Sequence, residues 1–167
     1  MKKVFMVLFV FLVFVSCSTY SPQPNLPSTI RSIAVPIFIN QTDKLNIEQY
    51  VTQKTIEEFL ADGKVSILDE VKSDAVVKCT IYKYVLTPIL FDVNQIPIQY
   101  RLRIYISLIF FDNKNQVQLW EEKSIWEETT YYVSNNLGMP VEDETIARNR
   151  VLDQIAKRIV ARVIYGR

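Results

Sequence analysis

Apolar and polar side chains alternate along several stretches of the chain, and elsewhere the apolar residues recur every three or four positions. A period of two indicates a strand with one buried face, and a spacing of three to four indicates a helix with one buried stripe. The alternating stretches predict strands at residues 30–39, 65–68, 75–86, 100–111 and 117–130. The helical spacing predicts helices at residues 47–61 and after residues 142–144.

The predicted strand at residues 100–111 has the clearest alternation. We expect its core face to consist of Tyr100, Leu102, Ile104, Ile106, Leu108 and Phe110. The opposite face begins cationic and becomes apolar, along Arg101, Arg103, Tyr105, Ser107, Ile109 and Phe111. A polar turn at residues 112–116 predicts a hairpin to the return strand, in which Trp120 and Trp126 belong to the same alternating set.

The predicted strand at residues 75–86 has a mostly apolar face and a mixed face. Strict alternation places Val77, Cys79, Ile81 and Val85 on the apolar face and Lys78, Thr80, Tyr82 and Tyr84 on the other, with Lys83 interrupting the apolar face. Pro88 and Pro97 punctuate the next stretch, so a loop is predicted over residues 87–99.

Both predicted helices have recognisable ends. Asp62-Gly63 ends the first helix, and Glu142, Asp143 and Glu144 lie where carboxylates meet the positive end of the dipole of the second. The second helix has an apolar stripe at Leu152, Ile155, Ala156, Ile159, Val160 and Val163. Its other side is basic, which is typical of a solvated face, at Arg148, Arg150, Lys157, Arg158 and Arg162.

These elements together predict the fold class. Each amphipathic helix needs one apolar sheet face to cover. The order strand, helix, short strand, three long strands, helix therefore predicts an α+β two-layer sandwich. Its mixed or antiparallel sheet has four to five strands, and both helices pack on one face.

The first residues predict export and lipidation. Lys2 and Lys3 precede an apolar run that is too short for the roughly 20 residues of a spanning helix, so residues 1–16 are interpreted as a removed signal peptide. Residues 13–17 resemble a bacterial lipobox, which implies a diacylglycerol on Cys17. Residues 17–29 carry three prolines and form a predicted tether, and residues 30–167 form a single domain. Ser18 in place of an aspartate favours sorting to the outer membrane.

Composition narrows the chemistry. The chain has 19 basic and 18 acidic side chains, no histidine and two cysteines. Zinc sites and histidine-dependent triads are therefore not expected, and no basic field indicates a nucleic-acid partner. No phosphate-binding glycine loop or cofactor site is recognised. An enzyme would need to use the carboxylates of the return strand as acid and base: Glu121, Glu122, Glu127 and Glu128. Carboxylates on the surface of a strand explain these residues more simply, so no enzyme is predicted.

A series of short motifs resembles the LptE family of lipopolysaccharide-assembly lipoproteins. The motifs occur in the family's order along residues 30–36, 46–50, 73–75, 82–88, 99–102 and 119–122. The resemblance implies a sheet covered by two helices, with the protein standing as a plug inside the β-barrel of the translocon LptD. It also implies contact with lipopolysaccharide and a lipid-anchored position on the periplasmic face of the outer membrane.

Two sets of residues are candidates for these contacts. Lys78, Lys83, Arg101 and Arg103 are candidates for pairing with lipopolysaccharide phosphates. Tyr105, Ile109 and Phe111, on the face away from the predicted core, need a cover, which could be the barrel wall or loops of the same chain.

A second class of function remains open at this point. Residues 33–40 also resemble the opening strand of lipoproteins that activate peptidoglycan synthases or form the curli secretion pore. A periplasm-facing regulatory or secretion-pore lipoprotein is therefore the alternative, although Leu119-Trp120-Glu121 and the last helix favour the LptE family.

Overall fold

The computed structural model describes residues 24–135 and 138–166. Its elements, in chain order, are β1 (Ser32–Ala34), β2 (Ile39–Asn40), α2 (Ile47–Asp62), β3 (Ser66–Ile67), β4 (Ala75–Phe91), β5 (Pro97–Asp112), β6 (Val117–Tyr132) and α3 (Glu144–Tyr165). The predicted tether residues 17–23 and the signal residues 1–16 lie outside the described residues, as does Cys17.

The sheet has six strands in the order β3-β1-β4-β5-β6, with β2 pairing beside β1 on the same edge of β4. The three long strands β4, β5 and β6 form an antiparallel meander, whereas β1 and β2 run parallel to β4. The strand predicted at residues 30–39 is divided at Pro36, because proline has no N–H to donate. This division accounts for the sixth strand, and the predicted α+β fold is confirmed.

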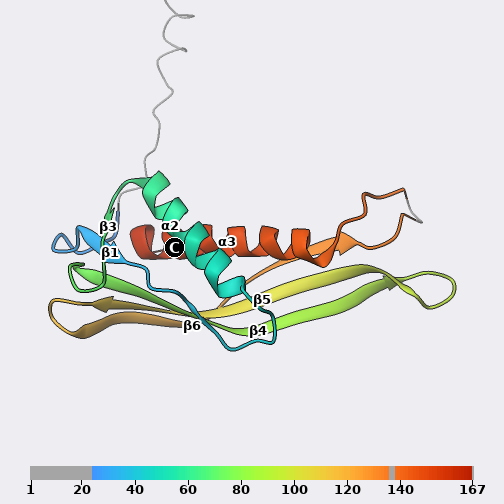
Figure 1. The fold of residues 1–167 in the computed structure, drawn as a ribbon, viewed down its shortest axis with the longest axis horizontal. Helices are drawn as coiled ribbons and strands as arrows, with labels where there is room; N and C mark the ends of the chain where they lie inside the picture. The colour runs from blue at the N-terminus through green and yellow to red at the C-terminus, as the bar shows by residue number, and fades with distance from the viewer. Residues whose placement is uncertain (1–23, 136–137, 167) are drawn as a thin grey trace, which may run out of the picture.

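Both helices lie on one side of the sheet, as predicted (Figure 1). α3 packs along β5 and β6, and α2 crosses α3 and contacts β2 and β3. Asp143 begins α3 by accepting a hydrogen bond from the Ile146 N–H at 2.9 Å, so the predicted acidic start of this helix is confirmed. Neither helix combines the length and apolar character that crossing a bilayer requires, within the residues that the structure describes.

The core lies between the sheet and the helices. Leu102, Ile104, Ile106, Leu108 and Phe110 of β5 are at most 1% exposed, which confirms the predicted core face of this strand. The predicted apolar stripe of α3 is also buried against them, at Leu152, Ile155, Ala156, Ile159, Val160 and Val163.

The prediction of a loop over residues 87–99 is wrong. β4 continues to Phe91 and β5 already begins at Pro97, so the two strands extend as a long hairpin. The Asp92 carboxylate closes the turn by accepting hydrogen bonds from the N–H groups of Asn94 and Ile96, both at 2.8 Å. Pro88 is tolerated because the far side of β4 has no partner strand there among the described residues, and Pro97 is the first residue of its strand.

Two β-bulges change which face several side chains occupy. In β4 the register shifts between Ile81 and Lys83, so Tyr84 pairs with Ile104 of the core face and Val85 pairs with Arg103 of the opposite face. The predicted faces of Tyr84, Val85 and Lys83 are therefore wrong, because strict alternation ignores the extra residue.

The second bulge separates the two tryptophans of β6. The β5 partners shift between Ile106 and Leu108, so Trp120 pairs with Phe110 beneath the helices and Trp126 pairs with Tyr105 on the other side. The prediction that both tryptophans share one face is consequently wrong.

Candidate functional site: the open face of the sheet

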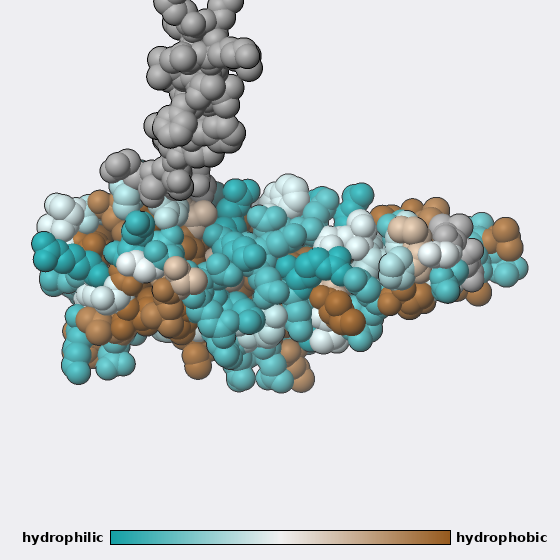
Figure 2. Space-filling model, turned by 90° about the horizontal axis from the view of Figure 1, so that it is seen from above, coloured by the Kyte–Doolittle hydropathy of each residue, from teal (hydrophilic) through white to brown (hydrophobic). Residues whose placement is uncertain are grey.

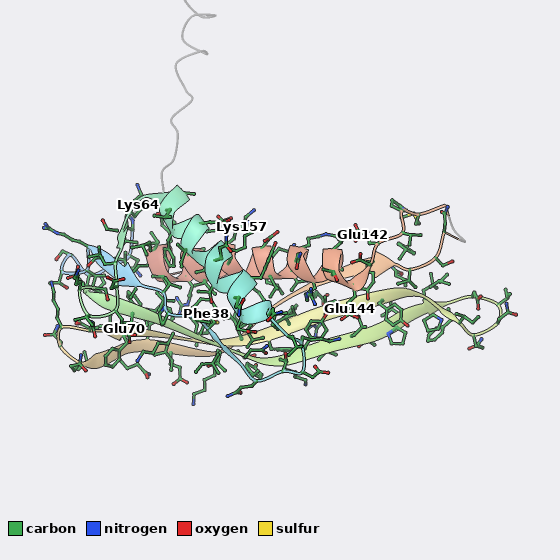
Figure 3. The ribbon with its side chains drawn as sticks, viewed as in Figure 1. Phe38, Lys64, Glu70, Glu142, Glu144 and Lys157 are labelled. Atoms are coloured by element: carbon green, nitrogen blue, oxygen red, sulfur yellow. The ribbon has the colours of Figure 1, made fainter. Side chains whose placement is uncertain are left out.

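Within residues 24–135 and 138–166, no helix or strand covers one face of the long antiparallel sheet. The helices occupy the other face, and the side chains on this one project away from the domain (Figure 3). We call this surface the open face. Strand register assigns to it Val76, Lys78, Thr80, Lys83, Val85 and Thr87 of β4, Arg101, Arg103, Tyr105, Ser107, Ile109 and Phe111 of β5, and Gln118, Glu121, Trp126, Glu128 and Thr130 of β6.

All seven residues predicted as contact candidates lie on the open face. The bulge in β4 brings Lys83 there, beside Tyr105, so the four cations and three apolar or aromatic residues form one continuous surface. No helix or strand of the described residues covers this surface.

The two lysines on the open face rest on aromatic rings. The Lys78 Nζ lies 4.9 Å from the ring centre of Phe111, and the Lys83 Nζ lies 5.4 Å from that of Tyr105. Such contacts contribute about 0.5–1 kcal/mol at exposed sites. Neither ammonium group has a carboxylate partner in the described part of the chain, so both remain able to pair with an external anion.

Arg103 is held more firmly than the lysines. Its Nε donates to a Glu128 carboxylate oxygen at 2.8 Å, and its Nη1 donates to the Tyr105 hydroxyl at 3.2 Å. Its guanidinium carbon lies 4.4 Å from the ring centre of Trp126. Three side chains from two strands, Tyr105 of β5 and Trp126 and Glu128 of β6, therefore fix one guanidinium on the open face.

Arg101 shares the same carboxylate more loosely. Its Nε lies 3.9 Å from the second oxygen of Glu128, beyond hydrogen-bonding distance, and its side chain is 46% exposed. Beside the two arginines lies a shallow hollow of about 110 Å³, lined by Val85, Thr87, Arg101, Arg103 and Tyr105. This hollow could hold a small anionic group.

Sequence reasoning missed the members of this site that β6 contributes. Glu128 and Trp126 complete it, but their place depends on the bulge in β6, which alternation alone does not reveal. The signal that could have found Glu128 was its position in the return strand, which allows it to pair with Arg103 across a hairpin of the right register.

Glu122 and Glu127, two of the four carboxylates considered for acid and base catalysis, have arginine partners on the helix side. The Arg158 Nε lies 3.3 Å from Glu127, the Arg162 Nε lies 2.5 Å from Glu122, and Arg150 pairs with Glu142. The basic side of α3 was predicted to be a solvated face, and these three arginines, which keep part of their side chains exposed, also pair α3 with β6 and its following loop.

A half-buried polar cluster fixes the start of α3 to the sheet. The Tyr84 hydroxyl donates to Glu144 at 2.7 Å, and the Lys44 Nζ lies 2.9 Å from the same oxygen. Burial and then the bond to Glu144 raise the pKa of Tyr84 far above its ordinary value. Burial alone would raise the pKa of Glu144, but the bonds from Lys44 and Tyr84 outweigh it and lower that pKa.

A family model described as "LptE: Lipopolysaccharide-assembly" matches residues 30–163 of the chain. This range spans every described strand and most of α3, and it includes the whole open face. No curated protein matches the chain in sequence.

Solved structures resemble the fold at low sequence identity. The hypothetical protein CT253 from Chlamydia trachomatis has a TM-score of 0.55 at 10% identity, covering 79% of this chain and 94% of that one. XCC0632 from Xanthomonas campestris has a TM-score of 0.54 at 12% identity, covering 85% and 89%. A minor lipoprotein from Acinetobacter baumannii has a TM-score of 0.52 at 12% identity, covering 82% and 92%. At these identities the likeness concerns the fold alone.

Proposed function

Because the chain belongs to the LptE lipopolysaccharide-assembly family, we propose that it is a non-enzymatic lipoprotein subunit of the outer-membrane lipopolysaccharide translocon. In this proposal it is the plug and assembly partner of an LptD-like β-barrel, and it contacts lipopolysaccharide during insertion. It is held at the periplasmic face of the outer membrane by the lipid on Cys17.

The open face is the observation that carries this proposal. A sheet face that bears Phe111, Ile109 and Trp126 together with four cations is neither a buried core nor an ordinary solvated surface. Trp126 is 45% exposed, and exposed aromatic side chains of this kind are typical of interfaces. The interior of an outer-membrane barrel is polar and can be filled by a plug, so a face of cations and aromatic rings suits it.

The far end of the β4–β5 hairpin supports the same role. Four apolar side chains around its turn are between 36% and 96% exposed, at Leu90, Phe91, Val93 and Ile96. Figures 1 and 2 show that this end projects beyond the helices and that its surface is partly apolar, together with the loop that leads from β6 to α3. An apolar projection without a cover is typical of a surface that enters a partner.

The described chain begins at the opposite end of α3. The Asn25 N–H donates to the Ile164 carbonyl at 2.7 Å, so the segment that leads back to Cys17 departs near the last turn of α3. The β4–β5 turn lies at the other end of the molecule (Figure 1). An anchor at one end and an apolar projection at the other are consistent with a plug that is tethered at the barrel mouth.

A pull-down tests the proposed partnership. The tagged lipoprotein, solubilised in mild detergent from its own outer membrane, should recover one large β-barrel protein in stable amounts. The double variant Phe91→Asp and Ile96→Asp places charges on the projecting end and should reduce recovery of the barrel relative to the native protein. Recovery of no barrel by the native protein would contradict the plug role.

Depletion of the protein separates the proposal from the regulatory alternative. Loss of a translocon subunit should lower lipopolysaccharide on the cell surface, measured by labelling intact cells. Unchanged surface lipopolysaccharide together with altered peptidoglycan cross-linking would favour the regulator of peptidoglycan synthesis.

A further inference from the structure

Two arginines on the open face share a single carboxylate. Glu128 receives the Nε of Arg103 at 2.8 Å, while the Nε of Arg101 lies 3.9 Å from its other oxygen. Two positive charges and one negative charge leave the group with a net positive charge. The unbalanced charge belongs to Arg101, because its contact with Glu128 is the longer of the two.

The contacts around the two arginines differ, which indicates a different role for each in binding a ligand. Tyr105 and Trp126 hold Arg103 from two sides, so its guanidinium keeps its position whether or not Glu128 is bound. Arg101 has no such support from these two rings, and its side chain is 46% exposed. Both side chains line the hollow, and Arg101 is the more exposed of the two, at 46% against 31% for Arg103.

We propose that Glu128 is a built-in counter-ion of the two arginines, and that the phosphate group of an anionic lipid displaces it from them. This inference rests on the proposed function, since it names a phosphorylated lipid headgroup as the ligand of the open face. Phosphate matches the site because guanidinium groups bind its oxygens through paired, charge-assisted hydrogen bonds.

Displacement of Glu128 has a consequence for affinity. The lipid phosphate gains contacts with Arg101 and Arg103 but must replace the contact between Arg103 and Glu128, so part of the gain is offset. The carboxylate thereby keeps the lipid weakly held on a surface that has to release it. Removing its charge should strengthen binding, which is the opposite of what removal of a contact residue does.

The fluorescence of Trp126 provides the measurement. The chain has two tryptophans, and Trp120 lies on the helix side, so a Trp120→Phe background leaves Trp126 as the reporter beside Arg103. The full-length lipoprotein, in a nonionic detergent, is titrated with bisphosphorylated lipid A in mixed micelles. Dephosphorylated lipid A and inorganic phosphate are titrated in parallel.

Glu128→Gln should tighten the binding of bisphosphorylated lipid A by roughly threefold or more, because the neutral amide no longer competes as an anion. Arg101→Ala should weaken it by about tenfold, which corresponds to one charge-assisted contact. Two matched controls should change it little. Glu121→Gln removes the same charge from the same strand and face, and Lys64→Ala removes a positive charge on the helix side (Figure 3).

Each unexpected outcome has a distinct meaning. Equal tightening by Glu121→Gln and Glu128→Gln would show a general charge effect and overturn the counter-ion role. Equal binding of inorganic phosphate or of dephosphorylated lipid would overturn the assignment of a lipid phosphate. If the native protein recovers the barrel in the pull-down while Glu128→Gln leaves lipid binding unchanged, this inference fails and the proposed function stands.

Discussion

The Arg162 Nε in the last turns of α3 lies 2.5 Å from the Glu122 carboxylate of β6, the outermost of the three long strands. The Arg162 guanidinium also lies 5.1 Å from the ring centre of Trp120. The helix is thus tied to the edge of the sheet by a charge pair that packs on an aromatic ring.

Reversing one charge of this pair should destabilise the domain, and reversing both should restore most of the loss. Glu122→Arg is expected to lower the free energy of unfolding by about 1 kcal/mol, since both side chains are about one third exposed and water screens the pair. Urea unfolding of Glu122→Arg, Arg162→Glu and the double variant measures the coupling. A double variant as unstable as the sum of the two single variants would contradict the pairing.

The carboxylate of Asp74 predicts a specific dependence of stability on pH. The contact with Lys114 and the bonds from the Arg31 and Ser32 N–H groups and the Ser32 hydroxyl hold its pKa well below the ordinary range. A lowered folded-state pKa contributes stability above the unfolded-state value of about 4, and the contribution is lost as pH falls below that value.

Asp74→Asn should therefore cost roughly 2 kcal/mol at pH 7, because buried donors lose a charged acceptor. The difference from the native protein should shrink between about pH 4 and pH 2. Urea unfolding at a series of pH values measures it, with Asp69→Asn, in the exposed connection before β4, as a control. A difference that is constant with pH would contradict the role of the charge.

Tyr84 predicts the behaviour at alkaline pH. Because burial raises its pKa, the neutral phenol is stabilised by folding below its ordinary pKa near 10, and this contribution is lost as pH rises through the folded-state value. Tyr84→Phe should cost about 1–2 kcal/mol at pH 7 by removing the bond to Glu144. Ultraviolet titration of tyrosine ionisation should show one fewer late-titrating group in this variant, and an unchanged late phase would contradict the assignment.

The bulge in β4 can be tested with two lysine substitutions. Strict alternation puts Ile81 and Val85 on the same face, whereas the structure puts Val85 on the open face and leaves Ile81 fully buried. Val85→Lys should change the free energy of unfolding by less than about 1 kcal/mol, and Ile81→Lys should prevent folding because it buries an unpaired charge. Circular dichroism and thermal unfolding compare the two, and equal damage would contradict the bulge.

The lipid that we propose on Cys17 should be needed for assembly but not for folding. Cys17→Ser removes the thiol that we propose receives diacylglycerol, and it leaves the sequence from residue 30 onward unchanged. The variant should keep the native circular dichroism and lose efficient co-purification with the outer membrane and its barrel. A soluble form that supports the same surface lipopolysaccharide as the native protein would show that the anchor is dispensable.

The sequence predicted the layers of this fold better than the details of its faces. The core face of β5 and the buried stripe of α3 follow from alternation and helical spacing, because each element is regular over its whole length. The faces of Tyr84, Val85 and Trp126 do not follow, because one extra residue in a strand reverses every later side chain.

The residues of the open face also divide into those that the sequence pattern predicted and those that it did not. Arg101, Arg103 and Tyr105 were found because they lie on a regular strand opposite an obvious core. Their partner Glu128 was not found, because its pairing with Arg103 depends on the register between β5 and β6 and on a bulge that local sequence does not predict. The extent of the β4–β5 hairpin was missed because a proline on a strand edge, or at the first position of a strand, looks the same in sequence as a proline in a loop.

The Asp74 contacts have a mechanical consequence for a tethered protein. β1 lies between β3 and β4, so it is paired on both sides. The Asp74 carboxylate accepts hydrogen bonds from the backbone N–H groups of Arg31 and Ser32, where the chain enters this strand. A force on the proposed anchor at Cys17 would therefore act on an interior strand and on the Asp74 contacts together, and not on a free edge strand.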